Sequence, residues 1–326
     1  MVKRVLITGI TGFAGGHLAA HLLERGGFDI YGAALDGGYG LDFLPQHVPV
    51  TRANLQDLQA VEALLDEVRP QHIYHLAAQA NVPAAWEDPW GTFENNVHPE
   101  LNILQTLARR KLDCRLLVVA SNEIYGAVSP ENLPVNEDAP LRPINPYGVS
   151  KAAQDLLALQ YHLSHGLDVI RVRAFNHLGP RQSPQFVAAS FACQIAEIEA
   201  GMRAPVLHVG NLEAQRDFTD VLDVVRAYAL LMEKGESGQA YNVGSGRAHS
   251  IRELLNVLLS MSAVPIRVEV DPHRARPIDA PLIVADITRL QRTTGWQPTI
   301  PFEESLRRVL SYWRAVVRQP GYQPGW

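Results

Sequence analysis

The sequence lacks the features that mark several classes of protein. Its 326 residues include two cysteines, Cys114 and Cys193, which are too few for a disulfide framework and lack the spacing of zinc ligands. Lysine and arginine form no block and the formal net charge is −5, so we expect no nucleic-acid partner. No apolar run approaches the ~18 residues of a membrane span, and the first run, residues 5–7, is too short for a signal peptide. These absences predict a cytoplasmic protein that binds neither membrane nor metal.

Short apolar runs rich in β-branched residues alternate with amphipathic stretches in the first half of the chain. The runs are typical of buried parallel strands, which we expect at residues 4–8, 30–35, 72–78, 116–121 and 169–175. The stretches between them have the length and periodicity of helices, at residues 13–25, 55–68, 97–110 and 146–165. This alternation predicts an α/β fold with a doubly wound parallel sheet, the Rossmann arrangement.

The alternation weakens after residue 175. Segments rich in proline and glycine, at 179–184 and 272–281, are interspersed with helices expected at residues 188–200, 220–234, 251–261 and 303–317. We therefore predict a first domain, residues 1–175, and a smaller C-terminal lobe, residues 176–213 and 246–326. Residues 214–245 are expected to return to the first domain, with a strand near 240–243 that joins its sheet.

A glycine-rich turn joins the first predicted strand to the first predicted helix. Residues 8–15 read Thr-Gly-Ile-Thr-Gly-Phe-Ala-Gly, with glycine at every third position. Glycine allows a tight turn, and N–H groups at a helix N-terminus can then approach a pyrophosphate, which the helix dipole also favours. We therefore predict a dinucleotide-binding domain whose cofactor contacts Gly9, Thr11, Gly12, Phe13 and Gly15. A glycine-rich turn without a ligand is the alternative.

The end of the second predicted strand carries a candidate for recognition of the adenosine ribose. Asp36 lies about 20 residues beyond Gly15, where a carboxylate can accept hydrogen bonds from the ribose hydroxyls and would repel a 2′-phosphate. This favours NAD(H) over NADP(H), although Arg52 could add positive charge nearby and Asp36 could be an ordinary turn residue. Asn54 and Leu55, in the loop after a short third extended run, are expected to flank the adenine.

A tyrosine and a lysine lie four residues apart at the start of a predicted helix. In residues 145–151, Asn-Pro-Tyr-Gly-Val-Ser-Lys, the asparagine caps the helix, so Tyr147 and Lys151 share one face. A phenol with a pKa near ~10 becomes a useful acid near neutral pH when an ammonium group stabilises its anion. Ser121 ends a predicted parallel strand, where ligands bind, and can bond the same substrate oxygen. The three residues predict catalytic proton transfer; an exposed tyrosine and lysine without a role is the alternative.

These motifs, in this order, resemble those of the extended short-chain dehydrogenase/reductases over residues 4–313. The shared stretches are 8–15, 75–78 (His-Leu-Ala-Ala), the segment beginning at Ser121, 147–151 and 173–177. More narrowly, the stretches 175–180, 210–221 and 276–281 are similar to those of the GDP-6-deoxy-D-mannose reductases and the GDP-mannose 4,6-dehydratases. The forms Phe-Asn-His-Leu-Gly-Pro and Arg-Asp-Phe-Thr-Asp-Val are more similar to the reductases.

The resemblance implies an NAD(P)-dependent enzyme whose C-terminal lobe binds a GDP-sugar. It implies further cofactor contacts from Leu76, Ala77, Ala78 and Asn96, as well as from the catalytic Tyr147 and Lys151. It implies that the sugar nucleotide is contacted by Ser121, Asn122, Glu123, Asn176, Arg216 and Arg276. A planar guanidinium suits the diphosphate that such a substrate carries.

The reaction that we expect is reduction of the C4 ketone of GDP-4-dehydro-6-deoxy-D-mannose to GDP-D-rhamnose. The first alternative is GDP-mannose 4,6-dehydratase, because Glu123 occupies the place of the base that removes the sugar C5 proton in those enzymes. Another nucleotide-sugar epimerase or dehydratase is a further alternative. A dinucleotide-sensing regulator, which is not an enzyme, would not need Ser121, Tyr147 and Lys151 together.

The helices predicted at 97–110 and 146–165 carry apolar residues on more than one face. Leu156, Leu157, Leu159 and Tyr161 are more than the sheet alone should cover. We expect a homodimer joined by a four-helix arrangement, as the family resemblance also implies.

Overall fold

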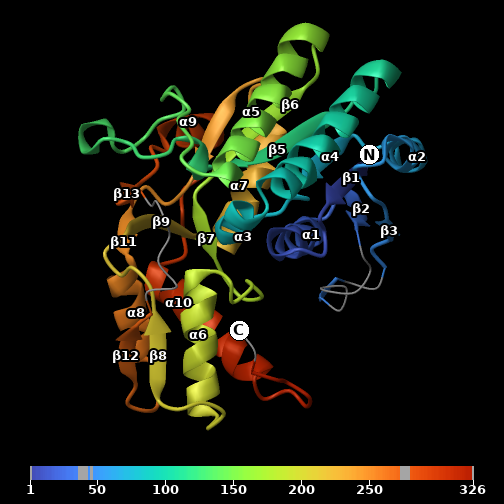
Figure 1. Cartoon of the computed structure of the whole chain (residues 1–326). Helices are drawn as coiled ribbons and strands as arrows, with labels where there is room; N and C mark the ends of the chain where they lie inside the picture. The colour runs from blue at the N-terminus through green and yellow to red at the C-terminus, as the bar shows by residue number, and fades with distance from the viewer. Residues whose placement is uncertain (1, 36–42, 45–46, 272–279, 325–326) are drawn as a thin grey trace.

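The structure is a computed structural model that describes residues 2–35, 43–44, 47–271 and 280–324. Seven parallel strands form its main sheet (Figure 1). The strand order is β10-β6-β5-β4-β1-β2-β3, and every neighbouring pair is parallel. The chain reverses its direction of progress across the sheet between β1 and β4, so the predicted doubly wound fold is confirmed. The strands are β1 (Lys3–Thr8), β2 (Phe28–Ala34), β3 (Val50–Arg52), β4 (His72–His75), β5 (Arg115–Ser121), β6 (Val169–Ala174) and β10 (Ala240–Val243).

Helices cover both faces of this sheet. On one face α1 (Phe13–Arg25) packs against α7 (Val221–Lys234). The other face is covered by α2 (Leu58–Val68), α4 (Pro89–Arg110) and α5 (Pro146–His165).

The main sheet is therefore buried on both sides. Successive side chains of a strand point to opposite faces, so Val5 and Ile7 join the core beside α1 and α7, while Leu6 joins the core beside α2 and α4. Burial on both faces explains why β1 is apolar in a continuous run rather than at alternate positions.

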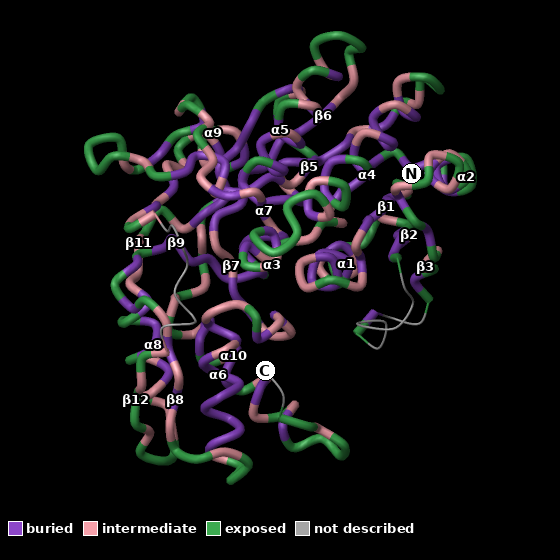
Figure 2. The backbone as a smooth tube through the Cα atoms, viewed as in Figure 1, coloured by how far each residue is buried: buried purple, intermediate pink, exposed green. Residues whose placement is uncertain are grey.

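A second unit is built mainly from the C-terminal half of the chain. Its central strand β9 (Gln215–Asp220) pairs with β7 (Asn176–Leu178), β11 (Ala248–Ser250) and β13 (Leu282–Ile283). A separate pair joins β8 (Val206–Val209) to β12 (Arg267–Val270). Around these strands pack α6 (Val187–Glu199), α8 (Ile251–Ser260) and α10 (Phe302–Val316), with an apolar core of their own. Figure 2 shows that α6 is buried along most of its length.

The helices at 13–25 and 146–165 have the predicted bounds, whereas others differ. Helix α4 begins at Pro89 rather than at residue 97. The sequence analysis did not predict α3 (Val82–Glu87), α9 (Thr288–Thr294) or two short 3₁₀ helices, Asn122–Ile124 and Pro130–Asn132. Among the described residues, no helix is long and apolar enough to cross a membrane.

The C-terminal half returns to the main sheet more than once. Of residues 214–245, α7 and β10 lie against and within the seven-stranded sheet, whereas β9 lies in the small sheet. Leu290 and Trp296, at and after α9, also belong to the core beside α1 and α7. The segment 288–296, which the sequence analysis assigned to the C-terminal lobe, therefore packs against the first unit.

Candidate active site

The turn between β1 and α1 is folded so tightly that two of its glycines have no room for a side chain. A Cβ on Gly15 would lie 2.2 Å from the Gly9 carbonyl oxygen, and a Cβ on Gly9 would lie 2.9 Å from Ala77. Gly9 also has φ +68°, a conformation that favours glycine. Gly12 is the N-cap of α1, and in the part of the chain that the structure describes no side-chain cap bonds the start of this helix. The turn therefore fits a pyrophosphate, which these N–H groups and the helix dipole would hold.

The segment after β4 is tied to the end of β1. The Leu76 N–H donates to the Thr8 carbonyl oxygen at 3.2 Å, and the Ala77 N–H donates to Thr8 Oγ1 at 3.3 Å. Thr8 Oγ1 also lies 2.9 Å from Nδ1 of the buried His75. These bonds bring Leu76, Ala77 and Ala78 beside the glycine-rich turn, at the carboxyl edge of the sheet where ligands bind in such folds.

Helix α5 places the tyrosine and the lysine beside the end of β5. Asn145 caps the helix by accepting from the Gly148 N–H at 2.7 Å, and Pro146 occupies the first turn, as predicted. Tyr147 and Lys151, one turn apart, are both buried. Lys151 Nζ donates to the Val119 carbonyl oxygen at 2.9 Å, which holds the ammonium group against β5.

Ser121, Tyr147 and Lys151 form one cluster. Burial raises the pKa of Tyr147. A hydrogen bond with Ser121 opposes this change, and the charge of Glu123 adds to it, so the pKa lies above the usual value for tyrosine. Burial also lowers the pKa of Lys151, to about 8, while the charge of Glu100 opposes that change. A phenol in this environment needs a nearby cation before it can become an anion, and Lys151 is the cation on the same helix face.

Glu123 and Asn122 follow Ser121 in a short 3₁₀ helix. Glu123 Oε2 accepts from Asn145 Nδ2 at 2.7 Å, so the helix cap of α5 holds the carboxylate in place. Asn122 is buried, with its Oδ1 at 3.4 Å from Ser121 Oγ. Both side chains therefore lie at the carboxyl end of β5 with Ser121.

Two of the residues expected to bind the sugar nucleotide lie on adjacent strands of the small sheet. Asn176 is on β7 and Arg216 is on β9, and these strands pair in parallel. Asn176 Oδ1 is buried and has no hydrogen-bond partner among the described residues, as expected of a group that awaits a ligand. Arg216 is buried, and its Nη1 donates to the Gln215 carbonyl oxygen at 2.8 Å. Arg276 lies outside the described residues.

The remaining cofactor candidates have different surroundings. Asn54 is exposed, and Leu55 is buried with its carbonyl oxygen bonded to Asn102. The buried Asn96 bonds the backbone of Gln79 in both directions and donates to Ser150 Oγ at 2.9 Å. In the structure Asn96 thus connects the loop after β4 to α5. Asp36 lies outside the described residues.

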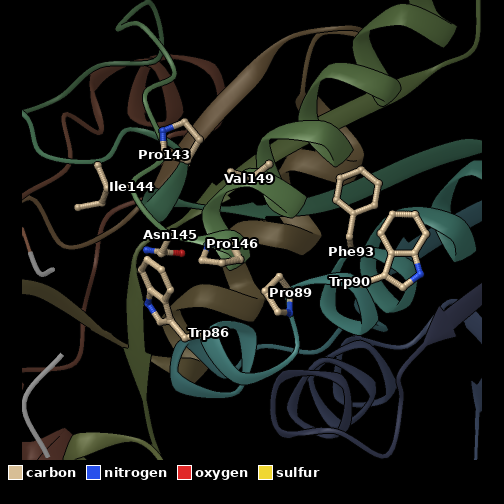
Figure 3. Close-up of a pocket in the computed structure, with 9 residues that line it drawn as sticks. All are labelled: Trp86, Pro89, Trp90, Phe93, Pro143, Ile144, Asn145, Pro146 and Val149. Carbon is tan, nitrogen blue, oxygen red and sulfur yellow. The ribbon is translucent and has the colours of Figure 1, made fainter. Parts of the chain in front are cut away.

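A surface hollow of about 640 Å³ opens beside the start of α5 (Figure 3). It is lined by apolar side chains of α3, α4 and the segment before α5, among them Trp86, Trp90 and Phe93. Of its lining residues, Asn145 is the one that also bonds Glu123. Ser121, Tyr147 and Lys151 do not line it, so this hollow is distinct from the catalytic cluster.

The sequence analysis missed one ionisable residue near the cluster. Glu100 lies on α4, is fully buried, and accepts a hydrogen bond from Gln154 Nε2 at 2.7 Å. No motif marks this glutamate in the sequence, because the packing of α4 against α5 is what brings it near Lys151. Among the described residues, no group of three or more His, Cys, Asp or Glu side chains could hold a metal ion.

The family model described as GDP-mannose 4,6 dehydratase matches residues 6–309 of this chain. The chain belongs to this family. It is 38% identical over 319 residues to the GDP-6-deoxy-D-mannose reductase of Pseudomonas aeruginosa, covering 98% of this chain and 100% of that protein.

Solved structures of relatives have the same fold. RMD from Pseudomonas aeruginosa in complex with NADPH is similar with a TM-score of 0.85 and 36% identity, covering 97% of this chain and 100% of that one. The UDP-glucose 4-epimerase of Thermus thermophilus in complex with NAD is similar with a TM-score of 0.87 and 34% identity, covering 96% and 100%.

Proposed function

We propose that the chain is an NAD(P)H-dependent reductase that converts GDP-4-dehydro-6-deoxy-D-mannose to GDP-D-rhamnose. The observation that carries this proposal is the 38% identity, over nearly the whole chain, to a GDP-6-deoxy-D-mannose reductase. The cluster of Ser121, Tyr147 and Lys151 supplies the groups that reduction of a ketone requires. The relatives solved with NADPH and with NAD support a nicotinamide cofactor.

In this proposal the side chains of the cluster bind the ketone oxygen of the sugar and donate one proton to it. A nicotinamide cofactor, when bound, would supply the hydride for C4 of the sugar. The Ser121 hydroxyl donates a hydrogen bond to O4 and polarises the carbonyl, and the Tyr147 phenol gives its proton to the same oxygen. Lys151 stabilises the phenolate that remains. The ketone thus gains one hydride and one proton and becomes the secondary alcohol.

In this proposal one unit of the fold binds the cofactor and the other binds the GDP-sugar. The first unit would hold the cofactor pyrophosphate at the N-terminus of α1, where the uncapped N–H groups lie. The C-terminal lobe would hold the GDP-sugar through Asn176 and Arg216, with Arg276 as a further arginine for the diphosphate. The unpartnered Asn176 Oδ1 supports this assignment, since it leaves an acceptor for a substrate donor.

GDP-mannose 4,6-dehydratase is the second candidate function. It is supported by the matching family model and by the resemblance that assigns Glu123 the position of the C5 base; Asn145 donates a hydrogen bond to this carboxylate. In the reductase this carboxylate would maintain the shape of the site and transfer no proton.

One pair of assays separates the two functions. With GDP-mannose alone, the reductase should form no product, whereas a dehydratase forms product without net consumption of reduced cofactor. With 4-keto GDP-sugar and reduced cofactor, the reductase should turn over, and Glu123→Gln should reduce that rate only mildly. Deuterium incorporated at C5 of product made from GDP-mannose in D₂O, and lost in Glu123→Gln, would replace the reductase assignment with the dehydratase.

We further propose that the cofactor preference is for NAD(H), because the Asp36 carboxylate would repel a 2′-phosphate. Arg52 opposes this preference: its Nε donates to the Leu35 carbonyl oxygen at 3.2 Å, which puts a guanidinium at the end of β2. The dissociation constants of NADH and NADPH should therefore differ, with NADH binding more tightly, and Asp36→Ala should narrow the difference. Arg52→Ala should widen the difference between the two dissociation constants, because it should weaken the binding of NADPH alone. If NADH and NADPH bind with equal affinity in the wild type, and again in Asp36→Ala, Asp36 does not determine the cofactor preference.

A further inference from the structure

Helices α4 and α5 are joined by two polar contacts next to the proposed catalytic lysine. Asn96 Nδ2 on α4 donates to Ser150 Oγ on α5 at 2.9 Å. One turn further along both helices, Gln154 Nε2 donates to Glu100 Oε2 at 2.7 Å. Lys151 lies on α5 between Ser150 and Gln154, so Glu100 faces the stretch of α5 that carries Lys151.

The Glu100 carboxyl is buried without a full set of partners. Its residue is 0% exposed, and Oε1 has no hydrogen-bond partner among the described residues, nor has Gln154 Oε1. A buried carboxylate is unfavourable unless a cation or several donors compensate it. One bond from a neutral amide is not enough, so Glu100 must either hold a proton or face a cation.

The charged groups around Glu100 identify that cation. Lys151 on α5 interacts favourably with Glu100, and Asp155, one turn beyond Lys151, interacts unfavourably. Asp155 is already paired with Arg171 at 2.7 Å and with Arg173 at 2.9 Å.

Among the described residues of the main sheet, His75 is a further titratable group that interacts with Lys151. His75 on β4 is fully buried, and burial together with the charge of Lys151 lowers its pKa to about 3. His75 is therefore uncharged near neutral pH and gives Glu100 no positive charge. Lys151 is the cation that faces Glu100.

We propose that Glu100 is a positioning residue that acts through Lys151, and that its negative charge keeps the buried ammonium group protonated beside Tyr147. Burial raises the pKa of Glu100 and lowers that of Lys151, so each group alone would tend to become neutral. Together they titrate as a coupled pair. The inference rests on the proposed catalytic role of Lys151 and not on the identity of the sugar.

Nuclear magnetic resonance can observe this pair without any turnover. The chain has four lysines, Lys3, Lys111, Lys151 and Lys234, so protein labelled with ¹³C-lysine gives four Cε signals, and Lys151→Met assigns one of them. In the wild type the Lys151 signal should titrate below the other three. In Glu100→Gln, an isosteric and neutral variant, its midpoint should fall by a further ~1 pH unit or more, because the ammonium group has lost its countercharge.

Two further variants control the experiment. Glu94→Gln removes an exposed carboxylate from the same helix and should leave the Lys151 titration unchanged. Glu100→Asp keeps the charge and should keep most of the wild-type midpoint. A Lys151 signal that titrates with the other lysines in the wild type would overturn the inference, and so would an equal midpoint in wild type and Glu100→Gln, or an equal shift in Glu94→Gln.

The pH profile of reduction provides the functional readout. Glu100→Gln should move the alkaline limb of kcat to lower pH by about the same amount as the Lys151 midpoint, with little change in KM for the sugar nucleotide. A merely structural role would lower kcat at every pH. If no 4-keto GDP-sugar is turned over by the wild type, the reductase proposal fails while the lysine titration still tests Glu100.

Discussion

Tyr147 lies where a phenolate is unfavourable until a cation compensates it. Burial and the charge of Glu123 both raise the pKa of Tyr147, and the hydrogen bond from Ser121 offsets only part of that change. His75 cannot supply that cation, because burial, together with the charge of Lys151, lowers its pKa to about 3. Lys151, one helical turn from Tyr147, is the cation that we propose compensates the phenolate, so its protonation state matters.

Replacement of Tyr147 by phenylalanine removes the proposed proton donor and keeps the ring. We expect kcat for reduction of the 4-keto GDP-sugar to fall by about 10²-fold or more, with little change in substrate affinity, because proton transfer takes place only in the transition state. Steady-state kinetics measure both values. Tyr161→Phe, on the same helix, is the matched control and should leave kcat near that of the wild type. A Tyr147→Phe enzyme with nearly normal kcat would show that another group supplies the proton.

At the scale of elements, local signals determined what could be predicted. Helices α1 and α5 were predicted with the right bounds, since a glycine turn or an Asn-Pro cap marks the start of each. Helix α4 was predicted to start too late, because the polar residues Glu94, Asn95 and Asn96 interrupt the apolar periodicity before residue 97. Strand β10 was predicted near residues 240–243, whereas the three-residue strands β7 and β11, which depend on partners distant in sequence, were not. No local pattern marks such pairings.

The candidate site shows the same division. Ser121, Tyr147 and Lys151 belong to motifs whose spacing has a physical meaning, and the structure gathers them at one end of β5. Glu100 belongs to no motif, because its environment is created by a contact between two helices whose bonded residues, Glu100 and Gln154, are 54 positions apart in sequence. The contact of Asn145 with Glu123 was missed for the same reason.

The turn between β1 and α1 supports a prediction about the phosphate site. Gly15→Ala would put a Cβ 2.2 Å from the Gly9 carbonyl oxygen, so the turn must open. We expect a lower thermal unfolding midpoint and, in addition, weaker binding of NADPH and NADH, measured by titration calorimetry. Gly166→Ala is the control: Gly166 has φ +68° but open space around it, so this variant should lose stability and keep its cofactor affinity. Equal cofactor affinity in Gly15→Ala and the wild type would show that the turn does not hold the pyrophosphate.

At the scale of the whole molecule, one face remains apolar after folding. Val149, Leu156 and Leu163 of α5 are 47%, 51% and 74% exposed, and their spacing of seven residues puts them along one side of the helix. The hollow of Figure 3 continues this surface, since Val149 lines it together with Trp86 and Trp90. Of the residues expected at an interface, Leu157 packs against the core beside α2 and α4, and Tyr161 is buried. The exposed stripe therefore differs from the predicted set.

We propose that α4 and α5 pair with the same helices of a second copy, which forms a homodimer across this stripe. A self-complementary face of this kind is what two-fold symmetry requires, and an exposed apolar stripe on paired helices is typical of an interface. Leu156→Glu combined with Leu163→Glu puts two like charges in each half of the interface, so sedimentation velocity at micromolar concentration should show a dimer for the wild type and a monomer for the variant.

The control for this prediction replaces an exposed leucine by glutamate elsewhere on the surface. Leu222 of α7 is 37% exposed, and Leu222→Glu should leave the dimer intact. Because each chain holds its own Ser121, Tyr147 and Lys151, the monomeric variant should retain its cofactor affinity, which separates loss of the interface from general unfolding. A wild type that sediments as a monomer, or a double variant that remains a dimer, would show that α5 does not form the interface.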